Sequence, residues 1–268
     1  MQADPEKILP PSRELLLLEA RSILEFGAFF ALLPWLRTAP RGDGHPVLVL
    51  PGLLASDVST LPLRTFLANC GYSVHGWEQG TNLGPREGVE ERMLGRLREL
   101  RQRYDRKVSL VGWSLGGSYA RRLARKSPED VRLVISLGSP FTGNPKASNV
   151  WRLFELVSGK EVEDLRRQTA ALPALTVPVT SIYSRSDGIV AWQNCIEQEG
   201  PLAENIEVEG SHSGLGHNAA ALYAVADRLA QREGEWRPFD RASAPARMYP
   251  DPHRDGESAM NTHERSRT

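Results

Sequence analysis

The sequence predicts an α/β fold in which a doubly wound, mainly parallel sheet carries helices on both faces. Short continuous apolar runs, such as residues 46–50 (PVLVL), are typical of strands that are buried on both faces. They alternate with segments of helical periodicity, and such alternation indicates βαβ units and a parallel sheet. An insertion at about residues 145–175 interrupts this rhythm. It predicts a small helical cap above the carboxyl edge of the sheet, where ligands bind in such folds.

Composition and charge limit the class of protein. Hydrophobic residues make up 40% of the 268 residues and charged residues 25%, as in globular proteins. With 33 basic and 33 acidic residues the formal net charge is zero, so the composition gives no reason to expect a nucleic-acid partner. Cys70 and Cys195 are too few for a disulfide scaffold and favour a reducing compartment. Whether these two cysteines pair stays open.

Residues 1–44 are predicted to form an N-terminal helix and a linker. The helix covers residues 12–33, with Ser12 as its N-cap and Pro34 at its end. Its second half is apolar on nearly every face, so another surface must cover it. Packing on its own domain is the favoured interpretation. A homodimer interface and contact with a membrane surface are the alternatives.

Neither a secretory leader nor a membrane span is predicted. The first residues are not a cationic segment, and acidic residues interrupt the apolar stretch that follows them. The longest uncharged run in that stretch, residues 26–36, is shorter than the roughly 20 residues that a bilayer requires. We therefore expect a cytoplasmic protein.

The main domain is predicted to cover residues 45–233. The predicted strands are residues 46–50, 72–75, 107–112, 131–137, 177–183 and 206–209. The predicted helices are residues 59–69, 89–104, 115–126 and 218–230, with two more at 150–157 and 161–171 in the insertion. Residues 234–268 are polar and rich in proline, which predicts a disordered tail.

The strongest local signal is the segment Gly112-Trp113-Ser114-Leu115-Gly116-Gly117. A hydrophobic strand runs directly into it and a helix follows, which is the setting of a nucleophile elbow. The strained turn of an elbow exposes the hydroxyl of Ser114, and the glycines let the helix approach the strand closely. The alternative is a plain strand–turn–helix with a capping serine.

A serine nucleophile requires a base, and the base requires an orienting acid. In folds with such an elbow the chain order is serine, acid, histidine. Asp187 follows the strand at 177–183 and so lies at the same sheet edge as Ser114; an ordinary turn is the alternative. Other acidic residues lie on less defined loop segments: Glu197, Glu199 and Glu204.

Two histidines compete for the role of the base. His212 lies in a loop rich in glycine and serine directly after the last strand, where an imidazole would hang over the nucleophile. His217 begins the final helix, and the N-terminus of a helix is a poor place for a cation. We therefore favour His212.

Acyl transfer also requires N–H donors for the oxyanion. One predicted donor is the backbone N–H of Leu115, directly after the serine. The other is Leu53 N–H, in the loop after an early strand, where Gly52 lets the backbone approach the substrate. An ordinary turn is the alternative for residues 51–52. The loop at residues 76–86 either rims the site or only joins strand to helix.

These segments together resemble the α/β-hydrolase superfamily, and within it the lipase-like esterases. The similar segments are Pro51-Gly52-Leu53 (oxyanion loop), Gly112-Trp113-Ser114-Leu115-Gly116 (elbow), residues 187–190 (acid turn) and residues 210–215 (histidine loop). The resemblance spans about residues 46–231. Pro51 departs from it, since many relatives carry histidine there. The resemblance implies the α/β-hydrolase fold and a catalytic domain at residues 45–233.

The function implied by this resemblance is hydrolysis of carboxylic esters by Ser114, His212 and Asp187, with Leu53 and Leu115 as oxyanion donors. Two other classes stay open. The same triad serves acyltransferases and thioesterases, and a non-catalytic scaffold would bind a ligand or partner. The sequence contains neither metal-ligand spacing nor a phosphate-binding glycine loop, so no cofactor is expected.

Apolar side chains near the predicted site indicate a pocket for a small-molecule ester or a lipid. The candidates for substrate binding are Leu54, Trp113, Trp151 and Phe154. Apolar pockets of this kind suit medium or long acyl chains. The alternative is that Trp151 and Phe154 only hold the cap on the sheet.

Overall fold

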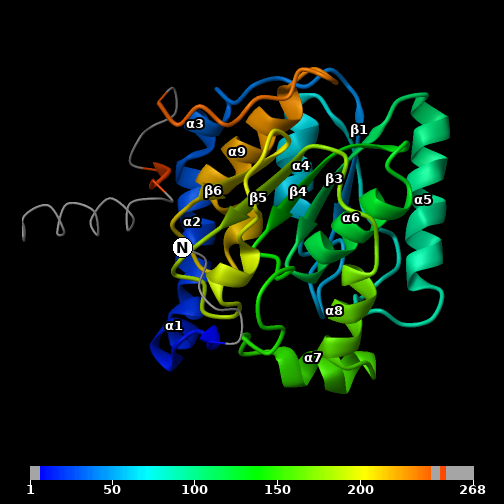
Figure 1. Cartoon of the computed structure of the whole chain (residues 1–268). Helices are drawn as coiled ribbons and strands as arrows, with labels where there is room; N and C mark the ends of the chain where they lie inside the picture. The colour runs from blue at the N-terminus through cyan, green and yellow to red at the C-terminus, as the bar shows by residue number, and fades with distance from the viewer. Residues whose placement is uncertain (1–6, 243–247, 252–268) are drawn as a thin grey trace, which may run out of the picture.

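A computed structural model describes residues 7–242 and 248–251 of the chain. Its centre is a six-stranded parallel sheet with the strand order β2-β1-β3-β4-β5-β6 (Figure 1). The strands are β1 (Pro46–Leu50), β2 (Ser73–His75), β3 (Val108–Trp113), β4 (Val131–Leu137), β5 (Val179–Tyr183) and β6 (Ala203–Glu207). All six predicted strands are present, which confirms the predicted fold class.

Helices cover both faces of the sheet. One hydrophobic core lies under α2 (Ser22–Ala31), α3 (Leu33–Leu36), α4 (Leu61–Cys70) and α9 (Ala219–Ala230). The other lies under α5 (Val89–Tyr104) and α6 (Leu115–Lys126). Strands β1 and β4, which lie between the two cores, are buried along their whole length, which explains why their sequences are nearly continuous apolar runs.

The predicted insertion folds into two helices, α7 (Trp151–Ser158) and α8 (Val162–Ala170). They lie together at one end of the sheet (Figure 1). Both contribute side chains to a cavity that also includes Ser114. The insertion is therefore a cap above the sheet edge at which β3 ends.

Strand β6 differs from its prediction, because it begins at Ala203 and includes three polar residues. The Glu204 side chain is buried, accepts hydrogen bonds from Arg228 and Thr180, and therefore tolerates a position inside the fold. The predicted strand at residues 206–209 overlaps β6 only at its last two residues. A local hydrophobic pattern does not show such buried polar partners.

The N-terminal segment is not the single helix predicted at residues 12–33. It consists of α1 (Arg13–Leu18), the 3₁₀ turn η2 (Glu19–Arg21), α2 and α3. Ser12 does cap α1, since its hydroxyl accepts a hydrogen bond from Leu15 N. Pro34 does not end a helix: it lies in the first turn of α3, where the N–H that proline lacks is not needed.

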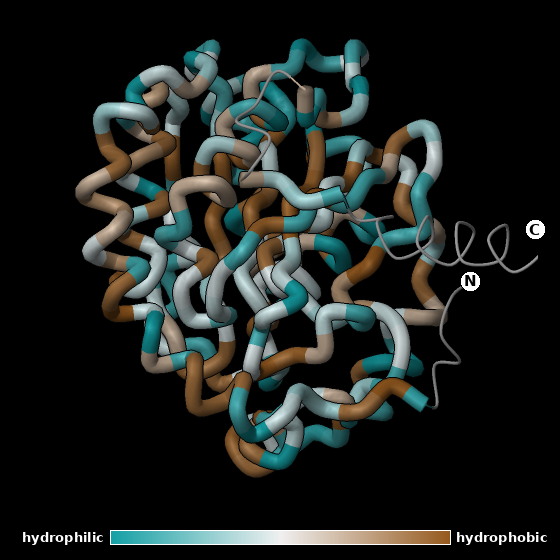
Figure 2. The backbone as a smooth tube through the Cα atoms, turned by 90° about the vertical axis from the view of Figure 1, so that its left-hand side faces the viewer, coloured by the Kyte–Doolittle hydropathy of each residue, from teal (hydrophilic) through white to brown (hydrophobic). Residues whose placement is uncertain are grey.

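The apolar face of this segment is only partly covered. Phe29 is buried in the core beside α9, as own-domain packing predicts. Leu17, Ile23 and Leu24 are each more than three-quarters exposed, at 79%, 77% and 78%. Figure 2 accordingly shows hydrophobic stretches both inside the molecule and along its edge. Contact of this face with a second copy or with a membrane surface stays a prediction.

The predicted disorder of residues 234–268 is wrong for the described part of that range. Phe239 and Tyr249 are buried in the core beside α9, and the Tyr249 hydroxyl donates a hydrogen bond to Ala220 O. Few apolar residues lie in this range, so its composition resembles that of a disordered segment, although two of its aromatic residues, Phe239 and Tyr249, are buried. The rest of the prediction, at residues 243–247 and 252–268, lies outside the described residues.

Two further predictions concern cysteines and location. Cys70 and Cys195 are free and buried in separate clusters, so they do not pair. Within residues 7–242 and 248–251, no helix is long and apolar enough to cross a membrane. The cytoplasmic location stays a prediction.

Candidate active site

The turn between β3 and α6 carries Ser114 in a strained backbone conformation, with φ 54° and ψ −122°. A positive φ is uncommon for a residue other than glycine and costs about 1–3 kcal/mol. A Cβ on Gly116 would lie 2.1 Å from Leu50 O, and one on Gly112 would lie 2.3 Å from the Gly116 carbonyl. Glycine is therefore required at both positions for strand and helix to meet at this angle.

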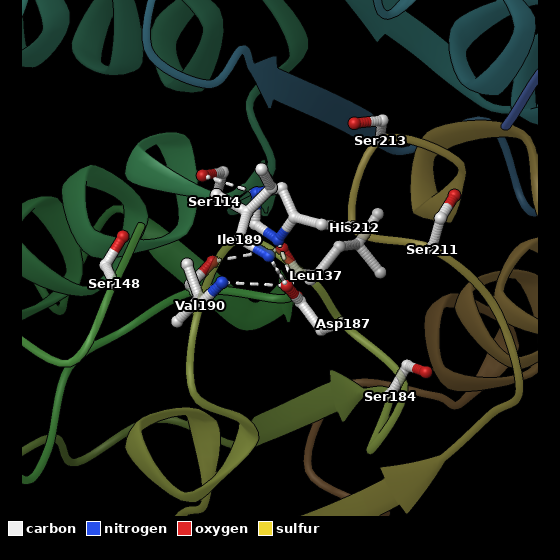
Figure 3. Close-up of polar contacts among 12 residues, drawn as sticks. Ser114, Leu137, Ser148, Ser184, Asp187, Ile189, Val190, Ser211, His212 and Ser213 are labelled. Atoms are coloured by element: carbon white, nitrogen blue, oxygen red, sulfur yellow. Dashed lines mark hydrogen bonds and ion pairs between the residues drawn. The ribbon is translucent and has the colours of Figure 1, made fainter. Parts of the chain in front are cut away.

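Three side chains from separate segments meet at this turn (Figure 3). His212 Nε2 lies 3.0 Å from Ser114 Oγ, and His212 Nδ1 lies 2.6 Å from Asp187 Oδ2. Ser114 begins α6, Asp187 follows β5, and His212 follows β6. Because parallel strands end at the same sheet edge, the three loops converge there. The structure thus brings together the three residues that the sequence pointed to.

The Asp187 carboxylate is held by its own loop. Its Oδ1 accepts hydrogen bonds from Ile189 N and Val190 N, each at 2.8 Å, which leaves Oδ2 for the imidazole. Gly138 faces this pair: a Cβ there would lie 3.1 Å from His212 Nδ1 and 3.3 Å from Asp187 Oδ2. The carboxylate therefore has a single orientation, toward the histidine.

The environment of His212 favours its protonated form. Burial alone would lower the pKa of His212, but the charge and hydrogen bond of Asp187 outweigh it, with a further contribution from the charge of Glu19. The net result is a pKa above the ordinary value of 6.5. Such an imidazole readily accepts a proton from a neighbouring hydroxyl.

The loop after β1 packs directly against the serine. A Cβ on Gly52 would lie 3.2 Å from Ser114 Cβ, so any larger residue there would crowd the nucleophile. Leu53 and Leu115 both line the cavity at Ser114. The next amide along the loop, Leu54 N–H, is bound to Asn82 O at 2.7 Å. The two predicted oxyanion donors are the backbone N–H groups of Leu53 and Leu115, and both residues therefore lie at the cavity of the nucleophile.

Asn82 holds this loop in place, a role that the sequence left undecided for residues 76–86. It is fully buried, and its Nδ2 donates to Pro51 O at 2.9 Å. Its backbone N–H donates to Ala55 O, and its backbone carbonyl accepts from Leu54 N. The segment that carries Leu53 N–H is thus fixed on both sides.

Sequence reasoning missed a carboxylate from the N-terminal segment. Glu19 is 9% exposed and accepts backbone hydrogen bonds from Gly188, His212 and Ser213, at 2.8, 2.9 and 2.9 Å. Burial alone would raise the pKa of Glu19, but these donors outweigh it and lower that pKa. Glu19 is therefore an anion that joins the acid loop to the histidine loop.

Two further side chains of the N-terminal segment strengthen this connection. Glu25 accepts hydrogen bonds from the backbone N–H and the hydroxyl of Ser211, and it pairs with Arg21 at 3.1 Å. Arg21 also donates to the carbonyl of Ser186 at 2.9 Å. We call Glu19, Arg21 and Glu25 the N-terminal clamp. In sequence these residues look like the solvated face of an amphipathic helix, so no local signal marks them.

A cavity of about 310 Å³ opens beside Ser114. Trp151 and Phe154 of the cap line it, as predicted. Leu54 and Trp113 are not among its lining residues, and their contact with substrate stays a prediction. Leu54 is 47% exposed and has a φ of 58°. Trp113 lies behind the histidine loop, where its Nε1 donates to His212 O at 3.1 Å.

The competing candidates have other partners. His217 Nε2 lies 3.1 Å from Ser22 O, and its ring packs against Phe26. Glu197 pairs with Arg121, and Glu204 pairs with Arg228 at 3.0 Å. Glu199 lies near Asn205, at 3.5 Å. Among the residues that the structure describes, no group of three or more His, Cys, Asp or Glu side chains is arranged to hold a metal ion.

Comparison with known proteins finds matches in structure only. No protein-family model matches the sequence, and no curated protein matches it. Lipase B of Aspergillus fumigatus superposes with a TM-score of 0.57 at 18% identity, over 75% of this chain and 55% of that one. The lipase BlEst2 of Bacillus licheniformis superposes with a TM-score of 0.52 at 19% identity, over 73% of this chain and 95% of that one. A monoacylglycerol lipase of Paleococcus ferrophilus superposes with a TM-score of 0.50 at 16% identity, over 70% of this chain and 96% of that one.

Sequence identities this low show a shared fold and leave the activity to be argued from the site. The superpositions cover 73% and 75% of this chain, whose centre is a parallel six-stranded sheet with helices on both faces. The chain therefore has the α/β-hydrolase fold. Its elbow serine, histidine and aspartate lie in the chain order that this fold uses for nucleophilic catalysis.

Proposed function

We propose that the protein is a serine hydrolase that cleaves carboxylic esters through an acyl-enzyme. The observation that supports this most is the continuous hydrogen-bonded series Ser114 Oγ–His212–Asp187, with Ser114 facing a cavity lined largely by apolar side chains. Aligned nucleophile, base and orienting acid are the requirement for attack by a serine hydroxyl at neutral pH.

In the proposed first step, His212 Nε2 takes the proton of Ser114 as its Oγ attacks the ester carbonyl. The carbonyl oxygen becomes an oxyanion that accepts hydrogen bonds from Leu53 N–H and Leu115 N–H, where each donor contributes about 3 kcal/mol in the transition state. Asp187 holds the tautomer of His212 and stabilises the imidazolium. His212 then protonates the leaving alcohol, and an acyl-enzyme remains on Ser114.

In the second step His212 removes a proton from water, and the resulting hydroxide attacks the acyl-enzyme. Collapse of the second tetrahedral intermediate releases the carboxylic acid and returns the proton to Ser114. Trp151 and Phe154 form the wall along which an acyl chain would lie. The aromatic lining favours a carboxylic ester with an apolar part.

Labelling with a fluorophosphonate probe tests this proposal. We expect stoichiometric labelling of the wild-type protein and loss of labelling and of 4-nitrophenyl ester hydrolysis in Ser114→Ala. Ser118→Ala is the matched control, since Ser118 lines the same cavity but its hydroxyl is bound to Pro140 O. Labelling that persists in Ser114→Ala would sink the nucleophile assignment.

Product analysis separates hydrolysis from the other uses of the same triad. Release of free acid from an oxygen ester in water supports the proposed function. Transfer of the acyl group to an added alcohol or thiol in preference to water would identify an acyltransferase. A thioester cleaved much faster than its matched oxygen ester would identify a thioesterase. No turnover of any ester would leave a binding scaffold.

A further inference from the structure

The cavity beside Ser114 is cationic at one part of its wall. Three arginines line it: Arg121, Arg125 and Arg166. No aspartate or glutamate of the described residues lines it. The rest of the lining is apolar, or carries a neutral hydroxyl. A cavity that only bound a hydrocarbon chain would gain nothing from guanidinium groups, because taking charges out of water costs free energy.

These arginines come from two sides of the cavity. Arg121 and Arg125 follow Ser114 on α6, and at a rise of about 1.5 Å per residue they lie about 10 and 16 Å along the helix axis from it. Arg166 lies on α8 of the cap. Arg125 also donates to Thr169 O of α8 at 2.8 Å, so the cap and α6 meet at this point. The cationic wall is therefore distant from the nucleophile and lies between sheet and cap.

Carboxylates of the protein neutralise only part of this charge. Arg121 is 3% exposed, pairs with Glu197 and stacks 3.6 Å above the centre of the Phe141 ring. Its Nη1 and the Nε of Arg125 are buried without a hydrogen-bond partner among the described residues. Within residues 7–242 and 248–251, neither Arg125 nor Arg166 forms an ion pair with a carboxylate.

We propose that the substrate of this site carries an ionised acidic group in addition to the bond that is cleaved. This inference rests on the proposed function. The apolar part of the substrate would extend from Ser114 along the cavity, and its carboxylate, sulfonate or phosphate would bind Arg125 and Arg166, next to the buried Arg121. Arginine is suited to this role because its planar group presents two parallel N–H donors to such an anion.

Matched ester pairs that differ by one charge test this inference. For an anion on the acyl side, the pair is mono-4-nitrophenyl suberate and its methyl ester. For an anion on the alcohol side, the pair is 4-(octanoyloxy)benzoate and its methyl ester. We expect kcat/KM for the anionic member of one pair to exceed that of the neutral member by roughly 10- to 100-fold, as a charge-assisted hydrogen bond predicts. The pair in which the anionic ester is preferred shows whether the anion lies on the acyl part or on the alcohol part of the substrate.

Variants then assign the preference to the arginines. Arg166→Gln, on an exposed part of α8, and Arg125→Gln should each reduce the ratio of anionic to neutral kcat/KM by about tenfold. Arg167→Gln is the matched control, because Arg167 is adjacent on α8, is exposed and pairs with Asp164 outside the cavity. Its ratio should equal that of the wild type. Thermal melting curves confirm that each variant is folded.

A binding measurement keeps this test separate from the proposed chemistry. In Ser114→Ala, calorimetry should show tighter binding of the anionic member of the preferred pair, whether or not the wild type turns it over. Equal binding and equal turnover within both pairs would overturn the inference and leave the proposed hydrolase intact. A preference that Arg167→Gln removes as strongly as Arg166→Gln would also overturn it. Absence of turnover with intact anion-dependent binding would reject the hydrolase alone.

Discussion

At the scale of single residues, the basicity of His212 depends on two carboxylates that come from distant parts of the chain. Asp187 contacts the imidazole directly, and Glu19 contacts the backbone amide of His212. Both charges raise the pKa of His212 against the effect of burial. Asp187 also orients the ring, whereas Glu19 lies behind the loop. Glu19 is therefore a positioning residue whose charge acts through His212.

We predict that Glu19→Gln lowers the pH at which activity is lost in acid. The reaction requires neutral His212, and removal of a nearby negative charge lowers the pKa of the imidazole. The acid limb of kcat/KM should therefore move to lower pH, and kcat should fall about tenfold because one carboxylate acceptor for the two loops is lost. Glu14→Gln, on the exposed surface of α1, is the control. An unmoved acid limb would contradict this role for Glu19.

His45 provides a prediction for stability. It is fully buried between Asp43 and Ser109. Burial, and then the charge of Arg132, lower its pKa to about 4, so the folded protein favours the neutral ring. The unfolded chain binds a proton near the ordinary value of 6.5. The stability that His45 contributes is thus complete above that value and is lost as the pH falls toward 4.

We therefore expect the wild type to lose about 2–3 kcal/mol more unfolding free energy than His45→Gln between about pH 7.5 and pH 4.5. Urea unfolding at the two pH values measures this difference. Other acidic groups titrate in both proteins, so the comparison isolates the histidine. Equal losses in the two proteins would show that His45 does not carry this dependence.

At the scale of elements, the N-terminal helices act as part of the site. Gly188 follows Asp187 directly, and a Cβ on it would lie 2.2 Å from Leu15 O in α1. The acid loop and α1 are therefore in backbone contact, as the N-terminal clamp requires. Gly27, in the exposed middle of α2, has nothing within 4 Å of the position that a Cβ would take. Gly188 of the acid loop is thus in tight contact with the N-terminal segment, whereas Gly27 within that segment is unconstrained.

We predict opposite effects for alanine at these two positions. Gly188→Ala should push α1 away from the acid loop and lower kcat by at least about tenfold, since small misplacements of catalytic groups are costly. Gly27→Ala should leave kcat unchanged and raise the unfolding free energy by about 0.5–1 kcal/mol, because glycine is a poor helix former. Steady-state kinetics and urea unfolding distinguish the two. Full activity in Gly188→Ala would show that α1 does not position the acid loop.

At the scale of the whole molecule, the chain closes on itself near its C-terminus. The backbone N–H of Phe239 donates to Glu204 of the edge strand β6 at 2.7 Å. Its ring contacts Tyr249 with centroids 4.8 Å apart, and Arg228 lies over it. Residues after α9 therefore cover one end of the core. They take no part in lining the cavity at Ser114, as far as the structure describes them.

We predict that Phe239→Ala lowers the unfolding free energy by about 3 kcal/mol, as expected for loss of a buried ring. Phe239→Leu should cost clearly less, because it refills most of the volume. Ester hydrolysis at room temperature should be unchanged in both variants. If Phe239→Ala unfolds at the same urea concentration as the wild type, the contribution of this segment to stability is rejected.

The limits of sequence-based prediction follow from the range of the contacts. The boundaries of β1 and β4, and of α6, agree with the sequence because short-range patterns define them: unbroken apolar runs, and a glycine-flanked serine between strand and helix. The choice between His212 and His217 was also correct in space, because loop position after a strand is a local feature. That Leu54 and Trp113 do not line the cavity could not be predicted, because a residue's place in a loop does not determine the direction of its side chain.

The sequence by itself determined the order of strands and helices and the convergence of Ser114, Asp187 and His212, since parallel strands must bring their following loops to one edge. Only the tertiary structure decided that Glu19 binds the amide of His212, 193 residues away, and that three arginines line the same cavity as the nucleophile. A glutamate or arginine on an amphipathic helix has the same local pattern whether it faces water or a buried partner. The path of the whole chain makes that difference.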